Sequence, residues 1–218
     1  QWSRDILEYK TESELIDNWA DIIFRNNSQP DKLNGCALTP TEMQQIISQI
    51  NGASPFAVNR RLNARYISII RDNPKDILHN GRRVDLLLFD KNQIAAGKSV
   101  YQIARQPRFA AISEILGGRR GDLMLLINGM PLFHIELKNT PVKAEQACNQ
   151  ISRYMQHGVF TGLFSLIQVF VAMTPEETLY FANPGRDRAF NPDYYFHWGD
   201  FNNKFINDWE EVAEKFLS

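Results

Sequence analysis

Three residues in the middle of the chain supply the side-chain types that can hold a divalent cation beside a phosphate group. Asp122 opens one apolar run, and Glu136 and Lys138 close the next, with Asn128-Gly129 between the two runs. Asn-Gly between runs of this composition is a strong hairpin signal, so we predict that the runs fold back on each other as strands. Two carboxylates and an ammonium group gathered at one end of a sheet suit metal-assisted hydrolysis of phosphodiesters.

The register of this hairpin decides whether the three side chains meet. Because side chains alternate across a strand, Glu136 and Lys138 share one face, and a two-residue turn would direct Asp122 to the other. We therefore predict a three-residue loop over 127–129, ending in a glycine bulge with positive φ. This register pairs Asp122 with His134, leaves the opposite face apolar, and brings the carboxylates of Asp122 and Glu136 to about 4–6 Å from each other.

Simpler interpretations stay open for each of these residues. Charged side chains at strand ends are commonly solvated, or form cross-strand ion pairs of little energetic weight. Asp85 is a rival for the metal-binding aspartate, because it lies in a similar apolar run, 84–89, that is expected to form a central strand. Asp122 is preferred because the hairpin joins it directly to Glu136. His134 is interpreted as a hydrogen-bonding neighbour of the site or as a structural residue.

The pattern of Asp122 followed by Glu136-x-Lys138 after a hairpin resembles the PD-(D/E)XK nuclease superfamily. Residues 128–132 (Asn-Gly-Met-Pro-Leu) and the helix expected next resemble, more narrowly, the nuclease domain of the restriction (R) subunit of type I restriction-modification enzymes. The resemblance implies an α/β fold with a restriction-endonuclease-like core, in which helices flank a central mixed β-sheet. It also implies Mg²⁺ held by Asp122, Glu136 and the Leu137 backbone carbonyl, with Lys138 orienting the attacking water.

The same resemblance implies auxiliary residues on two helices. Gln150 and Tyr154 match the Gln-x-x-x-Tyr motif that some of these nucleases carry after Glu-x-Lys. Residues four apart lie on one side of a helix, so we expect both to face the metal and to contact DNA or orient Lys138, although a solvated polar face is the ordinary alternative. Glu14, in preference to Glu12, is the candidate for an additional metal ligand, and its alternative role is helix capping.

Arg119 and Arg120 are the candidates for contacts with DNA. The formal net charge of the chain is -1, so its overall charge does not predict binding to nucleic acid. Contacts to phosphates need only a local basic surface, and these two arginines immediately precede Asp122. For them, as for other arginine clusters in the chain, a solvated loop charge is the alternative.

Start and stop signals and apolar periodicity predict the elements around the hairpin. We expect helices over 11–27, 39–50, 55–73, 140–158 and 205–217, and further strands over 100–103, 166–173 and 179–182. The segment Gly97-Lys98-Ser99 is rejected as a phosphate-binding loop, because the glycine required upstream is replaced by Asn92 and a strand follows it.

Length and composition favour a single globular domain. The chain has 218 residues, of which 44% are hydrophobic, and we expect a nuclease core over about 8–183 with a C-terminal extension over 184–218. No apolar run reaches the length of a membrane span. The two cysteines, Cys36 and Cys148, lack metal-ligand spacing and are too few for a disulfide framework, so we expect a soluble protein in a reducing compartment. The resemblance implies the cytoplasm of a bacterium or archaeon.

The resemblance implies double-stranded DNA as substrate and the methyltransferase and specificity subunits of a type I complex as partners. It also implies motor domains in the same longer protein, and ATP would be needed only there. Two alternatives remain: a non-catalytic DNA-binding or subunit-docking module of the same fold, and a free-standing RecB-like nuclease. A Cas4-like enzyme would require four cysteines for an iron-sulfur cluster, and the chain has two.

Overall fold

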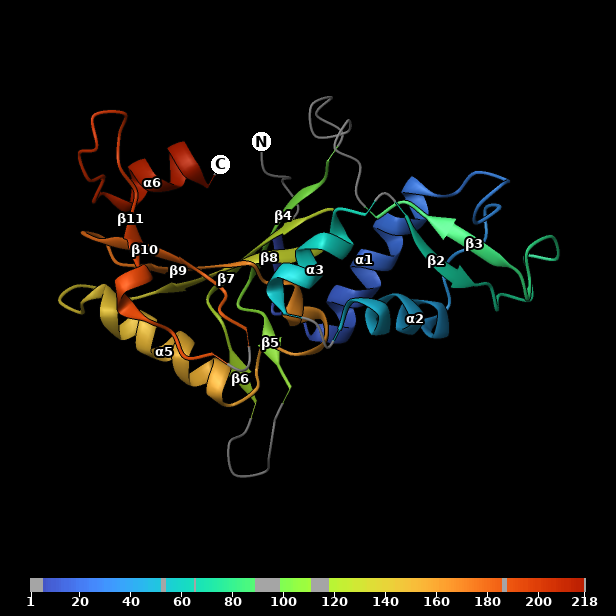
Figure 1. The fold of residues 1–218 in the computed structure, drawn as a ribbon, viewed down its shortest axis with the longest axis horizontal. Coiled ribbons are helices and arrows are strands. Elements are labelled where there is room, and N and C mark those ends of the chain that lie inside the picture. The colour runs from blue at the N-terminus through green and yellow to red at the C-terminus, as the bar shows by residue number, and fades with distance from the viewer. Residues whose placement is uncertain are drawn as a thin grey trace.

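A mixed β-sheet of seven strands forms the centre of the molecule (Figure 1). The computed structural model describes residues 6–51, 54–64, 66–88, 99–110, 118–185 and 188–217. In spatial order the strands are β1 (Ile6–Glu8), β4 (Tyr101–Arg105), β7 (Leu123–Ile127), β8 (Met130–Leu137), β9 (Val169–Met173), β10 (Thr178–Ala182) and β11 (Phe196–His197). β1 pairs with β4 and β8 with β9 in parallel, and the other neighbours are antiparallel. This α/β architecture is the restriction-endonuclease-like core that was predicted.

Helices cover both faces of the sheet. In the described ranges they are α1 (Glu12–Asn26), α2 (Pro40–Ile50), α3 (Pro55–Leu62), α5 (Ala144–Gln156) and α6 (Trp209–Phe216), with 3₁₀ turns η1 (Gly162–Leu166) and η2 (Pro192–Tyr194). Buried side chains of α1, α2, α3 and α5 join one large core with Met124 of β7. Val212 of α6 joins a smaller core with Leu125, the next residue of β7. Because consecutive strand residues face opposite ways, α5 and α6 lie on opposite faces of the sheet (Figure 1).

The predicted helix starts at Thr11 and Thr39 are confirmed. Each threonine accepts a hydrogen bond from the backbone N–H three residues on, and the glutamates there, Glu14 and Glu42, bond back to complete capping boxes. α5 begins at Ala144, later than predicted, after Lys143, which makes no side-chain cap. The predicted strands over 166–173 and 179–182 appear as β9 and β10.

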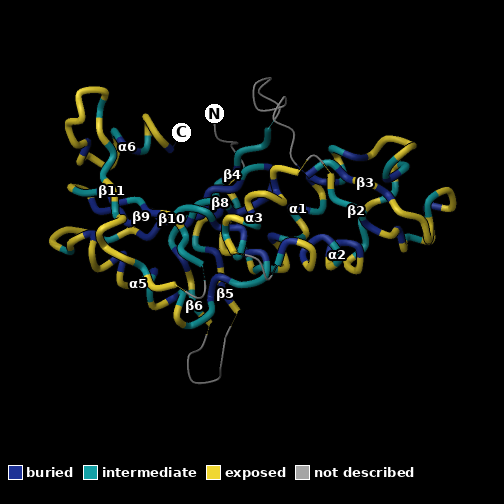
Figure 2. The backbone as a smooth tube through the Cα atoms, in the orientation of Figure 1, coloured by how far each residue is buried: buried dark blue, intermediate teal, exposed yellow. Residues whose placement is uncertain are grey.

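Two predictions for the segment between α2 and β4 are wrong. The helix expected over 55–73 ends at Leu62, and β2 (Ile67–Ile70) follows it. The run over 84–89 is not a central strand, because β3 (Arg83–Leu86) pairs antiparallel with β2 in a separate sheet of two strands. Alternation explains β2, since Ile69 is buried whereas Ile70 is half exposed. Figure 2 shows that the outer end of this small sheet and the region of α6 are largely exposed.

The C-terminal segment is joined to the sheet by β11 and to the smaller core by α6. The helix predicted over 205–217 is confirmed over a shorter range, as α6. A further pair of short strands, β5 (Arg108–Phe109) and β6 (Arg119–Arg120), lies just before Asp122. The division of the chain at about residue 184 stays a prediction.

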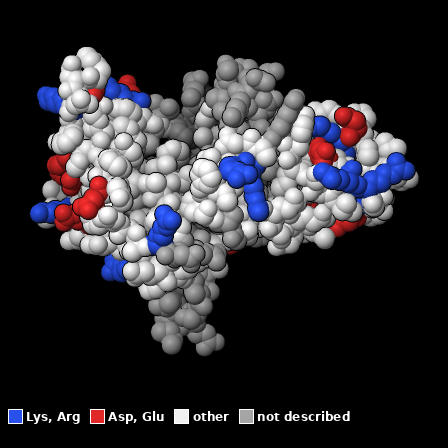
Figure 3. All heavy atoms as spheres, in the orientation of Figure 1, with Lys and Arg blue, Asp and Glu red and all other residues white. Residues whose placement is uncertain are grey.

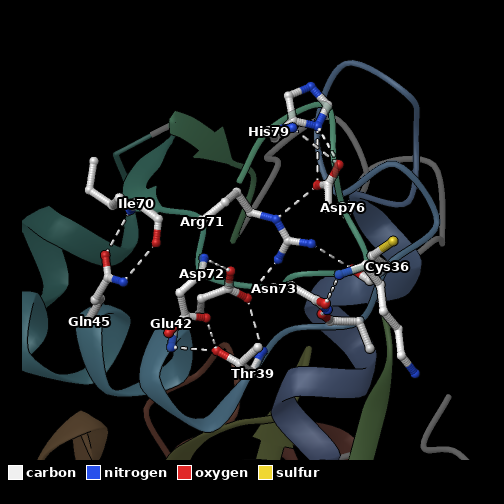
Figure 4. Close-up of polar contacts among 12 residues, drawn as sticks. Cys36, Thr39, Glu42, Gln45, Ile70, Arg71, Asp72, Asn73, Asp76 and His79 are labelled. Atoms are coloured by element: carbon white, nitrogen blue, oxygen red, sulfur yellow. Dashed lines mark hydrogen bonds and ion pairs between the residues drawn. The ribbon is translucent and has the colours of Figure 1, made fainter. Parts of the chain in front are cut away.

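A buried network of ion pairs ties the loop after β2 to α2 (Figure 4). Arg71 is 1% exposed, and its guanidinium donates to Glu42 at 2.6 Å and to Asp76 at 3.1 Å, both carboxylates being fully buried. Glu42 also accepts the backbone N–H of Asp72 at 2.8 Å, and Asp76 accepts that of His79 at 3.3 Å. Buried charges are tolerated when every one of them is paired, and this network meets that condition.

We predict that Arg71→Met lowers the free energy of unfolding by about 3–5 kcal/mol, because it leaves two carboxylates buried without their cation. Urea unfolding measures the change. Arg83→Met is the matched control: Arg83 pairs with Asp85 at 3.4 Å on the surface, where the side chain of Arg83 is 70% exposed, so its loss should cost less than about 1 kcal/mol. Equal stability of the two variants would contradict a structural role for the network.

Candidate active site

The turn of the β7–β8 hairpin differs from the predicted one. Ile127 pairs with Met130, so the loop contains only Asn128 and Gly129, and the predicted three-residue loop is wrong. Asn128 has φ 52° and Gly129 φ 82°, as a type I′ turn requires, and the positive φ predicted for Gly129 is confirmed. A Cβ on Gly129 would also lie 2.9 Å from Cα of Trp19, so the packing of α1 against the turn demands glycine as well.

A β-bulge near the turn restores the parity that the site needs. Leu125 pairs with Phe133, but Leu126 pairs with Pro131, which leaves Leu132 as an extra residue in β8. One extra residue shifts the facing of all later pairs by one position, as a three-residue loop would have done. The predicted facing of Asp122 toward the side of the hairpin that carries Glu136 is therefore confirmed, although the predicted loop length is wrong.

Beyond the bulge, Asp122 lies opposite the end of β8 that carries Glu136. Leu123 pairs with Ile135, and Asp122 Oδ2 accepts the backbone N–H of Leu137 at 2.8 Å. Asp122 therefore lies across from Glu136, whereas the predicted register paired Asp122 with His134.

The pKa values of Asp122 and Glu136 are shifted in opposite directions. Burial raises the pKa of Asp122, and the neighbouring charge of Glu136 raises it further, against the opposing effect of the Leu137 N–H. Burial also acts to raise the pKa of Glu136, but the His134 ring and the Lys138 ammonium together outweigh burial and lower it. Because the charge of Glu136 acts on Asp122, the two carboxylates are neighbours, as a shared cation requires. Their predicted separation stays a prediction.

Glu136 is almost completely buried and has several polar neighbours. It is 1% exposed, and its Oε1 accepts hydrogen bonds from Lys138 Nζ at 3.1 Å and from Gln150 Nε2. Its Oε2 lies 3.4 Å from His134 Nε2, without hydrogen-bond alignment. Lys138 Nζ donates in addition to the Leu137 carbonyl at 3.1 Å. The backbone oxygen, the carboxylates and the cation therefore share one strand end.

Gln150 and Tyr154 both point toward this strand end from α5. Gln150 Nε2 donates to Tyr154 Oη at 2.7 Å as well as to Glu136, so the expected orientation of the pair is confirmed. Their partner is Glu136 and not Lys138. Tyr154 Oη donates to the Arg120 carbonyl at 3.1 Å, and the guanidinium of Arg119 lies 5.6 Å from the centroid of the Tyr154 ring. The motif thus links α5 to β6.

Two candidates from the sequence, Glu14 and Asp85, do not join Asp122 and Glu136. Glu14 is held by its capping box and by an ion pair with Lys10 at 3.1 Å, and the Thr11 N–H and then Lys10 lower its pKa to about 2. Asp85 lies in the separate β2–β3 sheet and accepts from Ser68 Oγ at 2.6 Å. In the ranges that the structure describes, no three His, Cys, Asp or Glu side chains are grouped to hold a metal.

The donor set nevertheless suits Mg²⁺ with few protein ligands. This ion takes oxygen ligands and usually keeps several waters, with one or two carboxylates supplied by the protein. Asp122 and Glu136 supply two neighbouring carboxylates, and Glu136 Oε2 is buried without a hydrogen-bond donor in the described part of the chain. A buried carboxylate oxygen that accepts no hydrogen bond from the described residues is a suitable ligand for a bound cation.

Comparison with known proteins identifies the family. Residues 3–189 match the model of the family described as type I restriction enzyme R protein N terminus. The chain belongs to this family. The endonuclease subunit of the type I restriction enzyme SsaAORF53P of Staphylococcus saprophyticus is 32% identical over 208 residues, which are 95% of this chain and 20% of that protein. The corresponding subunit of SauCOLORF180P from Staphylococcus aureus is also 32% identical, over 94% of this chain and 20% of its own length.

A more distant relative is the endonuclease subunit of the type I restriction enzyme EcoprrI of Escherichia coli. It is 30% identical over 143 residues, which cover 65% of this chain and 44% of that protein. This R-protein N-terminal domain therefore spans about a fifth of the length of the staphylococcal relatives.

Two features of the domain's site escaped sequence reasoning. Gly121 is needed because a Cβ there would lie 2.8 Å from Cε1 of His134, and Phe109 packs against both His134 and Tyr154. The glycine directly before Asp122 was the available signal for the first. No local pattern marks Phe109, because its contacts are made across the fold.

We predict that Asp122→Asn raises the free energy of unfolding in EDTA near neutral pH. The pKa of Asp122 is raised on folding, so its ionisation disfavours the folded state at pH values above the ordinary pKa of 3.8. At lower pH both the folded and the unfolded chain hold the proton, and the advantage of the variant should disappear. Urea unfolding in EDTA at about pH 7 and about pH 3 measures both effects. A variant that is less stable than the parent at neutral pH would contradict mutual repulsion in the pair.

Proposed function

We propose that this chain is the DNA-cleaving domain of a type I restriction enzyme R subunit, an endonuclease that hydrolyses phosphodiester bonds of double-stranded DNA with Mg²⁺. The observation that carries the proposal is the meeting of Asp122 and Glu136 at one strand end, where Lys138 and Gln150 both donate to Glu136. The relatives' names, which describe endonuclease subunits of type I enzymes, support the same class of activity.

Each residue of the site has its own role in the proposed hydrolysis. Asp122, Glu136 and the Leu137 carbonyl would hold Mg²⁺, which when bound polarises the scissile phosphate and lowers the pKa of an attacking water. Lys138 now donates to Glu136 and to the Leu137 carbonyl. Its flexible stem lets the same ammonium reach a phosphate at this strand end, where it would orient the water and offset the charge that develops in the transition state.

Contacts with DNA are assigned to Arg119 and Arg120. Arg120 is exposed and Arg119 is partly so, with the Arg119 guanidinium against the ring of Tyr154, so the two cations border the site that would receive the phosphate. On the face seen in Figure 3 the acidic side chains gather at the two ends of the molecule. Local cations, and not the net charge of -1, would therefore position the DNA backbone.

We propose that the domain acts within a larger assembly. The staphylococcal relatives are about five times as long as the matched part, and we propose that motor domains of the same longer protein use the ATP. Methyltransferase and specificity subunits would complete the complex, and the cytoplasm would be its location. None of the helices in the described ranges is long and apolar enough to cross a membrane.

We predict that Glu136→Ala and Lys138→Ala each lower Mg²⁺-dependent nicking of a supercoiled plasmid by at least about a hundredfold, since each removes a group at the reacting phosphate. Asp85→Ala is the matched control, because this exposed carboxylate lies in the other sheet and should leave nicking unchanged. Nicking by the parent that survives EDTA, or that survives Glu136→Ala, would contradict the mechanism. A parent that binds DNA without Mg²⁺-dependent nicking would favour the non-catalytic module.

A second prediction concerns the Gln-x-x-x-Tyr motif. Gln150→Leu should lower the nicking rate by about 10–100-fold, the usual effect of losing a group that orients a metal ligand. Gln146→Leu, on an exposed position of the same helix, should retain the parental rate. Rates measured over a range of Mg²⁺ concentrations test both, and similar losses in the two variants would show that Gln150 acts only through the stability of α5.

A further inference from the structure

His134 is buried in a cage of aromatic rings that gives its polar atoms no partner. The residue is 0% exposed, and its ring centroid lies 5.3 Å from that of Phe160 and 6.1 to 6.3 Å from those of Phe109, Phe170 and Tyr154. In the described part of the chain neither ring nitrogen makes a hydrogen bond. An unpaired buried polar group costs about 1–3 kcal/mol. Packing alone would be served better by phenylalanine, so the nitrogens need another explanation.

The explanation lies in the neighbouring carboxylate. His134 Nε2 is 3.4 Å from Glu136 Oε2, and this oxygen also lacks a hydrogen bond among the described residues. Lys138 and Gln150 both use the other oxygen, Oε1. Among the described residues, the imidazole is thus the polar group that lies against the Oε2 side of Glu136.

The imidazole is held where it lies. A Cβ on Gly121 would come within 2.8 Å of Cε1 of His134 and within 3.2 Å of the ring of Phe109. Glycine before Asp122 therefore makes room for the histidine on the neighbouring strand, and the aromatic cage leaves it no other place. The ring of His134 therefore has a fixed position beside Glu136, whereas Lys138 and Gln150 reach the carboxylate with long flexible side chains.

We propose that His134 is a positioning residue: its Nε2 holds the Oε2 side of Glu136, so that the carboxylate keeps one orientation toward Asp122 and a bound divalent cation. This inference rests on the proposed function. A residue without a ring nitrogen at position 134 leaves the orientation of Glu136 to the flexible side chains of Lys138 and Gln150 alone. Groups that orient a metal ligand from behind commonly change metal affinity by about 10–100-fold.

The test is the binding of Mn²⁺ to the 218-residue chain, with the free ion counted by electron paramagnetic resonance. His134→Phe fills the cage with a ring that has no nitrogen, and should weaken Mn²⁺ binding by about tenfold or more. His134→Gln carries an amide nitrogen close to the position of Nε2, and should restore the affinity to within a few-fold of the parent. Thermal unfolding in EDTA should show His134→Phe to be at least as stable as the parent, because this variant removes two unpaired buried nitrogens, and the same measurement shows whether His134→Gln is folded.

His197→Phe is the matched control. His197 also lies on a strand beside a carboxylate, Glu177 at 3.2 Å, but its side chain is 28% exposed and it belongs to β11. This variant should bind Mn²⁺ as the parent does.

Each of the following results of the Mn²⁺-binding experiment either supports or overturns the role of His134. Weak binding by His134→Phe with rescue by His134→Gln supports the inference. Parental affinity of His134→Phe, where Glu136→Ala abolishes binding, overturns the inference and leaves the proposed function in place. No Mn²⁺ binding by the parent overturns both, and failure of both His134 variants to fold assigns the residue to the core and overturns the inference alone.

Discussion

Asp122 and Glu136 can act together only if two strands present alternate residues to the same side, and this parity is the constraint on which the site depends. The type I′ turn at Asn128 and Gly129 sets the wrong parity, and the extra residue Leu132 corrects it. The turn is itself fixed by α1, whose Trp19 packs on Gly129. A loop longer by one residue would give the same parity, but it is not the loop that packs against Trp19 in this structure. The bulge thus reconciles the packing of α1 with the chemistry at the far end of the hairpin.

The burial of both faces of the hairpin explains why the sequence predicted the correct facing of Asp122 together with an incorrect loop length. We predicted one apolar face for the core and one face for the site. The structure instead has a core on each face, and His134 and Glu136 are buried on the side of the larger one. When both faces are apolar, the hydrophobic pattern does not reveal where an extra residue enters a strand. The meeting of Asp122 with Glu136 and the apolar opposite face predicted the parity of the register, but neither located the extra residue in the strand.

Elsewhere, prediction succeeded where a local interaction decides the structure and failed where packing does. The capping boxes at Thr11 and Thr39 are closed by residues three positions away, so sequence alone locates α1 and α2. The apolar residues of β2 also fit a helical period, and a run of four residues cannot discriminate between the two. What makes β2 a strand is its pairing with β3 and the side chain of Gln45, which bonds both the backbone N–H and the carbonyl of Ile70.

The two buried charge clusters of the domain differ in a way that separates stability from function. Around Arg71, the guanidinium and both carboxylates are paired in full. Around Glu136, one carboxylate oxygen and both nitrogens of His134 lack hydrogen bonds in the described ranges. Complete pairing of the buried charges suits a structural cluster such as that around Arg71, whereas the unpaired oxygen of Glu136 among the described residues is compatible with the metal-binding role proposed for this carboxylate.

α5 contacts both of the segments that carry the carboxylates, and these contacts do not depend on where the helix begins. Gln150 reaches Glu136 at the end of β8, and Tyr154, one turn later, reaches the carbonyl of Arg120 in β6, two residues before Asp122. One helix face therefore contacts the segments that carry both carboxylates. Because the i, i+4 spacing keeps Gln150 and Tyr154 on one face of the helix, the start of α5 at Ala144 in place of Thr140 does not separate them. The position of the two carboxylates relative to each other thus depends on the hairpin register and on α5 together, and an error in either would separate them.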